Sequence, residues 1–374
     1  MRVLIAPNAF KNSLDATAAA AAIEEGLLSS GLDCSCDCFP VGDGGDGTAA
    51  LLVQHFKGVQ VPVTVSDPLN RKMTASFGLI DHGATAIIEM ADAAGLRLLQ
   101  PGELNPLAAT SFGTGEMIRA ALDKKVKKII IGMGGSATVD GGCGILHALG
   151  LHFLDREGAE LKNLPADLVE LERIGTRNLD SRIHACEMVV LCDVDNKLLG
   201  EKGAAKVFGP QKGATPAAVQ HLDAALSRFA AIALLATGKD IAAVPRGGTA
   251  GGAAAGLYGF IDAKLVNGID YFLDLSSFDK ALAKADMLIT GEGSIDEQTL
   301  NGKAPYGVAR RAKQKNIPVI GLAGSVSAAP GSPLFNIFDR LMSINNEEPD
   351  LKTAMLHTRQ NLVRTAMALG KMLA

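Results

Sequence analysis

The sequence predicts an α/β protein with two α/β domains, one Rossmann-like with a mostly parallel sheet, the second inserted and containing antiparallel or mixed strands. Short runs rich in β-branched residues alternate with longer helical stretches, a pattern typical of βαβ units. The length of 374 residues favours two domains over one. The 48% hydrophobic and 20% charged residues are ordinary for a globular protein and exclude a disordered or fibrous chain.

Both ends of the chain carry the βαβ pattern. Arg2–Ala6 predicts a first strand, and residues 37–41 predict a second. Between them, Asp15 can cap a helix that Gly31 can end. A final helix with one apolar side is expected from about Pro349 to the C-terminus. Three strands separated by helices precede it, at residues 285–293, 317–324 and 339–344.

The middle of the chain has a different pattern. Residues 59–80 alternate apolar and polar side chains around an Asp-Pro-Leu-Asn turn, which predicts an antiparallel hairpin. Residues 84–90 are expected to add a third strand to that sheet. Lys128–Met133 and Val189–Cys192 are continuous apolar runs, typical of strands buried on both faces. The longest central helix is expected within residues 215–238.

These patterns predict the domain organisation. Because the two chain ends share the βαβ pattern, they are expected to form one domain from residues 1–60 plus 275–374. The inserted domain is then residues 61–274. No low-complexity linker marks either junction.

Charge and hydropathy narrow the class of protein. The chain has 36 basic and 40 acidic residues, a formal net charge of −4, so nothing in its charge favours nucleic acid or an anionic membrane as a partner. No apolar run reaches the ~18–20 residues of a membrane-spanning helix. The apolar start before Pro7 is too short for a signal peptide. We therefore expect a cytoplasmic protein with no nucleic-acid and no membrane partner.

The six cysteines are thinly scattered, which suits reduced thiols. Cys34, Cys36 and Cys38 alternate, so on a strand they would share one face. Three thiols could bind a soft metal, but no fourth ligand lies nearby and the spacing is not that of a zinc site. We favour small hydrophobic residues on a strand face.

Five glycine-rich segments nearly all follow predicted strands, where glycine lets backbone N–H groups close on phosphate oxygens. Any one of them can be a simple turn, but five together favour an anionic ligand. The phosphate-binding candidates are Gly132, Gly134, Gly135, Ser136, Gly291 and Gly293. The segments are residues 41–48, 131–142, 208–215, 247–256 and 289–296.

Known nucleotide motifs do not explain these segments. The P-loop pattern is absent. Residues 132–137 (GMGGSA) approach the relaxed dinucleotide pattern, but no acidic ribose ligand closes an ordinary βαβ unit after them. An NAD-dependent dehydrogenase is therefore the weaker alternative. The histidines are scattered, with no metal spacing and no nucleophile elbow, so a Ser-His-Asp hydrolase is unsupported.

Carboxylates at predicted strand ends indicate candidate catalytic and metal-binding residues more sharply than the glycine segments do. Asp193 ends a buried strand and is the first candidate for a general base, and Asp46 is the second. Met287–Thr290 predicts a buried strand, after which Gly291 and Gly293 are expected to turn the chain sharply. Glu292 and Asp296, on either side of that turn, could hold Mg²⁺ or could instead cap the turn or the next helix.

Three lysines complete a set that suits phosphoryl transfer, which needs cations, a metal-binding carboxylate and a base. Lys11 follows the first strand, whereas Lys212 and Lys303 lie beside glycines. Each lysine could instead be a solvated surface residue. The residues alone therefore predict a phosphate-handling α/β enzyme.

Longer segments are similar to the type I bacterial glycerate kinases, in the same order from residue 1 to the last helix. Two positions depart from the family pattern. Asp195 replaces the Asn that often follows the CDV strand, and Val139 replaces the Asn of a loop that often reads SATNDGG. The shared segments are IAPNAFKNSLDA, PVGDGGDGT, SDPLNRKMTASFG, IEMADAAGL, TSFGTGE, IIIGMGGSATVDGG, CDVDNKLLG, GAAKVFGPQKGAT, ITGEGSID and NGKAPYGVA.

The resemblance implies ATP-dependent, Mg²⁺-dependent phosphorylation of D-glycerate and a cleft between two α/β domains. By chemical type, Lys11 would hold the glycerate carboxylate and Asp193 or Asp46 would accept the hydroxyl proton. Glu292 and Asp296 would serve Mg²⁺, and the glycine loops with Lys212 and Lys303 the nucleotide phosphates. A kinase of another small hydroxy acid and a non-catalytic nucleotide-binding regulator stay open, as do the hydroxyl phosphorylated and a homodimeric state.

Overall fold

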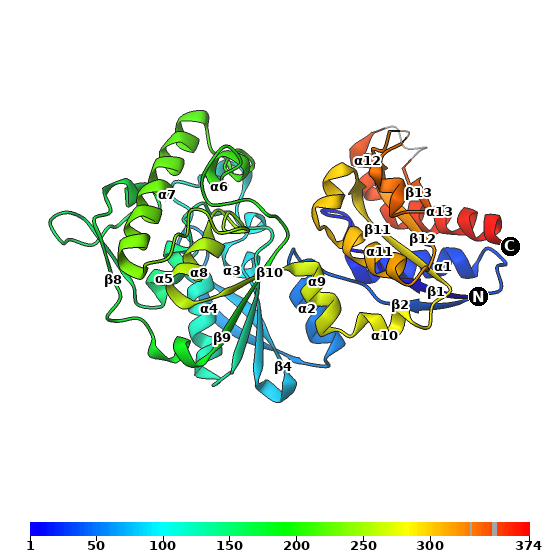
Figure 1. Cartoon of the computed structure of the whole chain (residues 1–374), viewed down its shortest axis with the longest axis horizontal. Helices are drawn as coiled ribbons and strands as arrows, with labels where there is room; N and C mark the ends of the chain where they lie inside the picture. Colours follow the sequence, from blue (N-terminus) through cyan, green and yellow to red (C-terminus); the bar gives the residue numbers. More distant parts are fainter. Residues whose placement is uncertain (330, 346–349) are drawn as a thin grey trace. The chain divides into compact units, whose positions relative to one another are not determined.

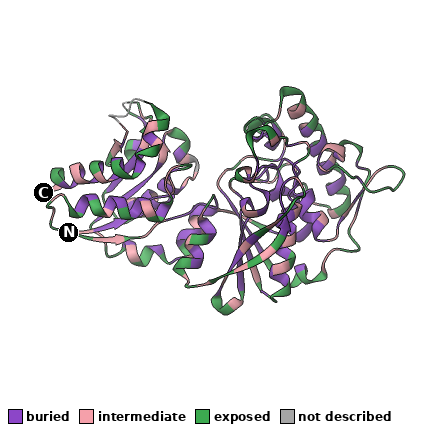
Figure 2. Ribbon diagram, turned by 180° about the vertical axis from the view of Figure 1, so that it is seen from behind, coloured by how far each residue is buried: buried purple, intermediate pink, exposed green. Residues whose placement is uncertain are grey.

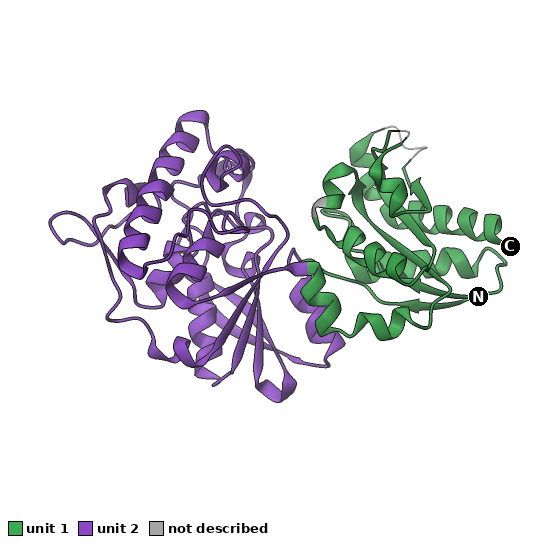
Figure 3. Cartoon of the chain, viewed as in Figure 1, with its two compact units in different colours: residues 1–43, 269–374 green, residues 44–268 purple. Residues whose placement is uncertain are grey.

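The computed structural model describes residues 1–329, 331–345 and 350–374. The chain forms two compact units (Figure 3). The first unit combines residues 1–43 with 269–374, and the second unit is the continuous segment 44–268. Each unit has its own sheet and its own buried core.

The first unit contains a five-stranded sheet in which every neighbouring pair is parallel. Its order, β13-β12-β11-β1-β2, places the N-terminal strand beside strands from the last quarter of the chain (Figure 1). This arrangement explains why the two ends of the chain carry the same βαβ pattern. The strands are β1 (Arg2–Ile5), β2 (Ser35–Cys38), β11 (Met287–Ile295), β12 (Val319–Val326) and β13 (Arg340–Ser343).

Helices pack on this sheet through alanine- and leucine-rich faces. The Asp15 carboxylate accepts a hydrogen bond from the Ala18 N–H and so caps the first helix, α1, as predicted. The buried faces of α1 and α13 share one core, which includes Ile23, Leu27 and Leu362. The helices are α1 (Ala16–Leu28), α9 (Gly268–Leu275), α10 (Phe278–Leu282), α11 (Ala304–Gln314), α12 (Leu351–Leu356) and α13 (Thr358–Leu373).

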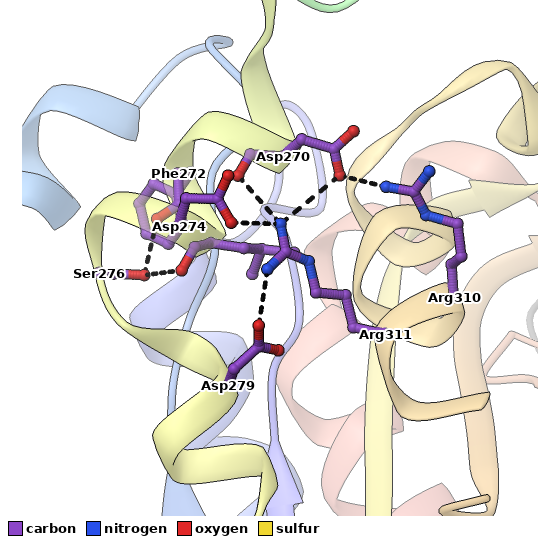
Figure 4. Close-up of polar contacts among 8 residues, drawn as sticks. Asp270, Phe272, Asp274, Ser276, Asp279, Arg310 and Arg311 are labelled. Carbon is purple, nitrogen blue, oxygen red and sulfur yellow. Dashed lines mark hydrogen bonds and ion pairs between the residues drawn. The ribbon is translucent and has the colours of Figure 1, made fainter. Parts of the chain in front are cut away.

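Ion pairs join α9 and α10 to α11 where the chain re-enters the first unit (Figure 4). The Arg311 guanidinium donates to the Asp274 carboxylate at 2.6 Å, the Asp279 carboxylate at 2.9 Å and the Asp270 carbonyl at 3.4 Å. Arg310 donates to the Asp270 carboxylate at 2.5 Å. Two adjacent arginines thus connect three helices.

The second unit contains a six-stranded mixed sheet in the order β10-β9-β6-β5-β4-β3. Strands β10, β9, β6 and β5 are parallel, whereas β5-β4-β3 form an antiparallel meander. A separate two-stranded sheet pairs β7 with β8. The strands are β3 (Val59–Ser66), β4 (Lys72–Ile80), β5 (Thr85–Glu89), β6 (Lys128–Gly132), β7 (His152–Leu154), β8 (Arg173–Gly175), β9 (Glu187–Cys192) and β10 (Lys264–Asn267).

Strands β5, β6 and β9 of this sheet are largely buried and lie among helices, whose exposed faces point to solvent (Figure 2), whereas the edge strand β10 is half-buried to exposed. The long helix α7 is apolar and long enough to cross a membrane. The core helix of a soluble protein passes the same test, and Leu222, Leu226 and Phe229 of α7 are buried in the core of this unit. The helices are α2 (Thr48–His55), α3 (Ala91–Ala94), α4 (Phe112–Asp123), α5 (Cys143–Ala148), α6 (Ala204–Phe208), α7 (Pro216–Thr237) and α8 (Ala253–Ile261).

The α/β class, with one parallel and one mixed sheet, is confirmed. The two compact units meet at residues 43/44 and 268/269, whereas the predicted domain boundaries are 60/61 and 274/275. Residues 44–60 belong to the second unit because α2 packs on β4 and β5. Residues 269–274 belong to the first unit, where α9 is bound to α11.

Three predicted elements differ in extent. The second strand covers Ser35–Cys38 rather than residues 37–41. The final helix is two helices, since α12 ends at Leu356 and α13 begins at Thr358, and its predicted start at Pro349 lies outside the described residues. The predicted turn after Thr290 is wrong, because β11 continues to Ile295 beside β12.

Candidate functional site

Glu292 is a buried carboxylate on β11 of the first unit, and it is 8% exposed. Its Oε1 has no hydrogen-bond partner within residues 1–329, 331–345 and 350–374. Burial raises the pKa of Glu292 to about 7; Lys303 and Lys11 act to lower it, whereas Asp43 and Asp296 act to raise it. A buried carboxylate oxygen without a donor is costly, so this position suits a bound cation or proton donor.

The turn after β1 lies beside this part of β11. The Asn8 amide N–H donates to the Gly291 carbonyl at 2.8 Å, and its side chain donates to the Asp43 carboxylate at 3.1 Å. A Cβ added at Gly293 would meet only the Lys11 backbone nitrogen, at 3.8 Å. Gly293 therefore leaves open space beside the backbone of Lys11. Lys11 itself is exposed.

Gly291 does not turn the chain as predicted, since it lies within β11. A Cβ there would overlap the carbonyl of Leu322 on the neighbouring strand, so glycine is required for strand packing. Lys303 is the N-cap residue of α11, and no side chain caps that helix. Its half-buried position puts a cation beside the positive end of the helix dipole.

Asp296 acts as a cap. Its carboxylate accepts a hydrogen bond from the Gln298 N–H at 2.8 Å, and its backbone N–H donates to the Thr299 hydroxyl at 3.2 Å. These bonds begin the 3-10 helix Glu297–Asn301. The contacts of Asp296 are thus those of the cap alternative considered from the sequence.

No group of three or more His, Cys, Asp or Glu side chains in the described parts of the chain is arranged to hold a metal ion. That finding covers Cys34, just before β2, and Cys36 and Cys38 within it. Cys34 and Cys36 are half-buried and pack against the core of the first unit, and burial raises the pKa of Cys36 and of Cys38 to about 12. Mg²⁺ differs from a soft metal because one or two carboxylates with substrate phosphates can suffice. Glu292 fits that requirement.

In the second unit, two glycine segments pack backbone against backbone. The Gly134 N–H donates to the Gly44 carbonyl at 2.9 Å, and a Cβ on Gly134 would overlap the Cα of Gly45. Gly135 has φ +68°, and a Cβ there would collide with the carboxylate of Asp46. These glycines thus allow the loop after β6 to approach the 44–46 segment, and the Gly134 N–H is not available to a phosphate.

Gly132 is the last residue of β6, in register with Glu89 of β5 and Leu191 of β9. The carboxyl ends of these three parallel strands therefore lie at one edge of the sheet. Asp193 follows β9 at this edge and is half-buried. Asp46 is exposed, and its carboxylate lies 3.9 Å from the Arg97 guanidinium.

Asp140 lies beyond the same loop, fully buried. Its carboxylate accepts four hydrogen bonds, from the N–H and hydroxyl of Ser111 and from the N–H groups of Gly142 and Gly144. The N-terminus of α5 is therefore already occupied by a carboxylate of the protein. This argues against a dinucleotide site, in which that helix end would bind the pyrophosphate.

Lys212 lies at the end of the 3-10 helix Pro210–Lys212 and is buried. Its ammonium donates to the Ser136 hydroxyl at 2.8 Å and to the Thr138 carbonyl at 2.7 Å. Burial lowers the pKa of Lys212 to about 7, whereas Asp140 and Asp193 act to raise it. Lys212 and Ser136, both predicted to bind phosphate, are hydrogen-bonded to each other.

Sequence reasoning missed Glu89 and Arg97. Glu89 ends β5, is 7% exposed and accepts a hydrogen bond from the Ala49 N–H at 2.8 Å, at the start of α2. Burial raises its pKa to about 7. Arg97 also pairs with Asp92. The signal for Glu89 was its place at the end of an apolar strand next to the strand that ends at Gly132.

Comparison with known proteins identifies the family. The profile of the glycerate kinase family matches residues 3–374. A Bacillus subtilis glycerate kinase is 43% identical over 98% of this chain and 96% of its own, and an Escherichia coli glycerate 2-kinase is 39% identical over 100% and 98%. A solved structure described as glycerate kinase 2 from Salmonella typhimurium LT2 has a TM-score of 0.84 at 42% identity, covering 100% of this chain and 98% of that one. The chain belongs to the glycerate kinase family.

Proposed function

We propose that this protein transfers the γ-phosphoryl group of ATP to the 2-hydroxyl of D-glycerate, giving 2-phosphoglycerate and ADP. The observation that carries the proposal is the family match across residues 3–374. The choice of the 2-hydroxyl is supported by the Escherichia coli relative, which is described as a glycerate 2-kinase. We also propose a cytoplasmic location, where ATP is available as co-substrate.

The transfer needs a proton acceptor for the attacking hydroxyl. The hydroxyl oxygen forms a bond to the γ-phosphorus, the bond from that phosphorus to the β,γ-bridging oxygen breaks, and ADP leaves with the electron pair. Asp193 is our first candidate to accept the hydroxyl proton and pass it to solvent, because it is half-buried at the carboxyl edge of the sheet. The exposed Asp46 is the second candidate.

The first unit supplies groups for the anionic reactants. Lys11 is exposed beside the open space at Gly293 and is proposed to hold the glycerate carboxylate. Lys303, at the start of α11, is proposed to bind a nucleotide phosphate. Glu292 would hold Mg²⁺, which when bound neutralises charge on the transferring phosphate.

The test is a direct assay of the purified protein. Incubation with ATP, Mg²⁺ and D-glycerate should release ADP in proportion to glycerate, and phosphorus NMR should show 2-phosphoglycerate. A product signal at the 3-position would correct the regiochemistry alone. No ADP release with D-glycerate would refute the kinase, and NADH formation from NAD and glycerate would favour the dehydrogenase instead.

A further inference from the structure

Lys212 is a charged side chain in a place where charges are rarely found. It is 3% exposed, and its ammonium nitrogen has two protein acceptors, the Ser136 hydroxyl and the Thr138 carbonyl. Both acceptors belong to the loop that follows β6. Burying an ammonium group lowers the free energy of unfolding, even when the group is hydrogen-bonded. A lysine kept in such a position is therefore a candidate for a functional role.

The loop to which Lys212 is hydrogen-bonded lies close to both candidate bases, Asp46 and Asp193. Gly135 of this loop packs against the Asp46 carboxylate, and Gly134 packs against the backbone of Gly45. At the start of the loop, Gly132 pairs with Leu191, two residues before Asp193. A displacement of the loop would therefore reach both Asp46 and Asp193.

Resting on the proposed kinase function, we infer that Lys212 is a positioning residue for phosphoryl transfer, which anchors the 132–138 loop from behind and does not itself bind the nucleotide. Asp140 and Asp193 favour its charged form from nearby. The carboxylate of Asp140 is itself engaged by four protein donors, so it does not compete for the ammonium hydrogen bonds. Lys212 thus depends on the loop for its hydrogen bonds.

This role predicts an effect on turnover rather than on nucleotide affinity. A displacement of about 1 Å at reacting groups can lower a rate by ~10²-fold. We expect Lys212→Met to lower kcat by ~10–100-fold, with KM for ATP changed by less than about threefold. Its melting temperature should change little, because methionine fills a similar volume and removes a buried charge, which offsets the donor lost by Ser136 and Thr138.

Lys206→Met is the matched control, since Lys206 lies on α6 and makes longer ion pairs, at 3.6 Å to Asp223 and 3.9 Å to Glu201. It should keep wild-type kcat. Ser136→Ala, which removes one acceptor of Lys212, should lower kcat in the same direction but less. A rise in KM for ATP as large as the fall in kcat, or a wild-type kcat in a folded Lys212→Met, would overturn the inference.

A second measurement does not use turnover. The full-length protein is treated with acetic anhydride, with and without ATP, and modified lysines are identified by mass spectrometry. Lys212 should stay unmodified in both samples, whereas the exposed Lys11 should react. Modification of Lys212 that ATP prevents would make it a nucleotide ligand and refute the positioning role. An inactive wild type would refute the kinase proposal without changing this labelling pattern.

Discussion

At the scale of single residues, Glu292 links the candidate site to the stability of the first unit. Its pKa rises from an ordinary value of 4.5 to about 7 in the folded protein because the carboxylate is buried. Between these pH values the folded state holds a proton that the unfolded chain has released. The free energy of unfolding therefore falls as the pH rises from about 4.5 to 7, and burial of Glu89 acts in the same direction.

Glu292→Gln should reduce this pH dependence, because glutamine does not ionise. Thermal or urea unfolding at several pH values should show a smaller loss of stability toward pH 7, by at most ~3 kcal/mol. Some dependence will persist through Glu89. Glu297→Gln is the control, since Glu297 is exposed at the start of the 3-10 helix that follows β11. Identical slopes for Glu292→Gln and the wild type would contradict the buried, proton-holding carboxylate.

Asp193→Asn tests the proposed proton acceptor. The amide has nearly the same shape but cannot take up the hydroxyl proton, so kcat should fall by ~10²-fold or more while the fold persists. Steady-state kinetics and circular dichroism check the two parts. Asp195→Asn, two residues further on and paired with Arg246 at 3.1 Å, should lose far less activity. Near-wild-type turnover in folded Asp193→Asn would move the role to Asp46.

At the scale of elements, two arginines of α11 hold α9, and they differ in burial and in the number of their hydrogen-bond partners. The Arg311 side chain is 14% exposed and bonds to three residues, whereas the Arg310 side chain is 41% exposed and bonds to one (Figure 4). Exposed ion pairs add little to the free energy of unfolding. A mostly buried guanidinium that donates to several acceptors adds more.

Arg311→Met should therefore lower the free energy of unfolding by about 1–3 kcal/mol, since Asp274 and Asp279 lose their partner. Arg310→Met should lower it by less than about 1 kcal/mol. Denaturant unfolding of the two variants gives the comparison. Equal losses would show that burial of the guanidinium adds nothing to the contact between these helices.

At the scale of the whole molecule, the two units differ in how the chain builds them. The second unit is one continuous segment with its own six-stranded sheet and core, whereas the first needs both ends of the chain to complete its sheet. A continuous segment with a complete core can fold by itself.

Residues 44–268 expressed alone should unfold cooperatively, as measured by circular dichroism during heating. They should show no kinase activity, because Lys11, Glu292 and Lys303 lie in the other unit. Residues 1–43 or 269–374 alone should not fold, since each lacks strands of the shared sheet. A disordered 44–268 fragment would show that the second core is insufficient.

The sequence by itself determined the features that depend on local pattern. Period-two alternation predicted the β3–β4 hairpin, continuous apolar runs predicted β6 and β9, and the Asp15 cap followed from its place before an alanine-rich helix. The α/β class and the combination of both chain ends in one sheet followed from the order of such patterns. Long shared segments indicated the family, which the comparisons confirmed.

Only the tertiary structure decided what the glycines and charges do. Gly291 reads as a turn in sequence, but β12 alongside makes it part of a strand. The sequence does not show the partners of Asp140 and Lys212, because distant segments supply them: Ser111 and Ser136 come from 29 and 76 residues away. The physical reason is that a glycine or a charge is compatible with several environments, and the packing of segments far apart in the chain selects one of them.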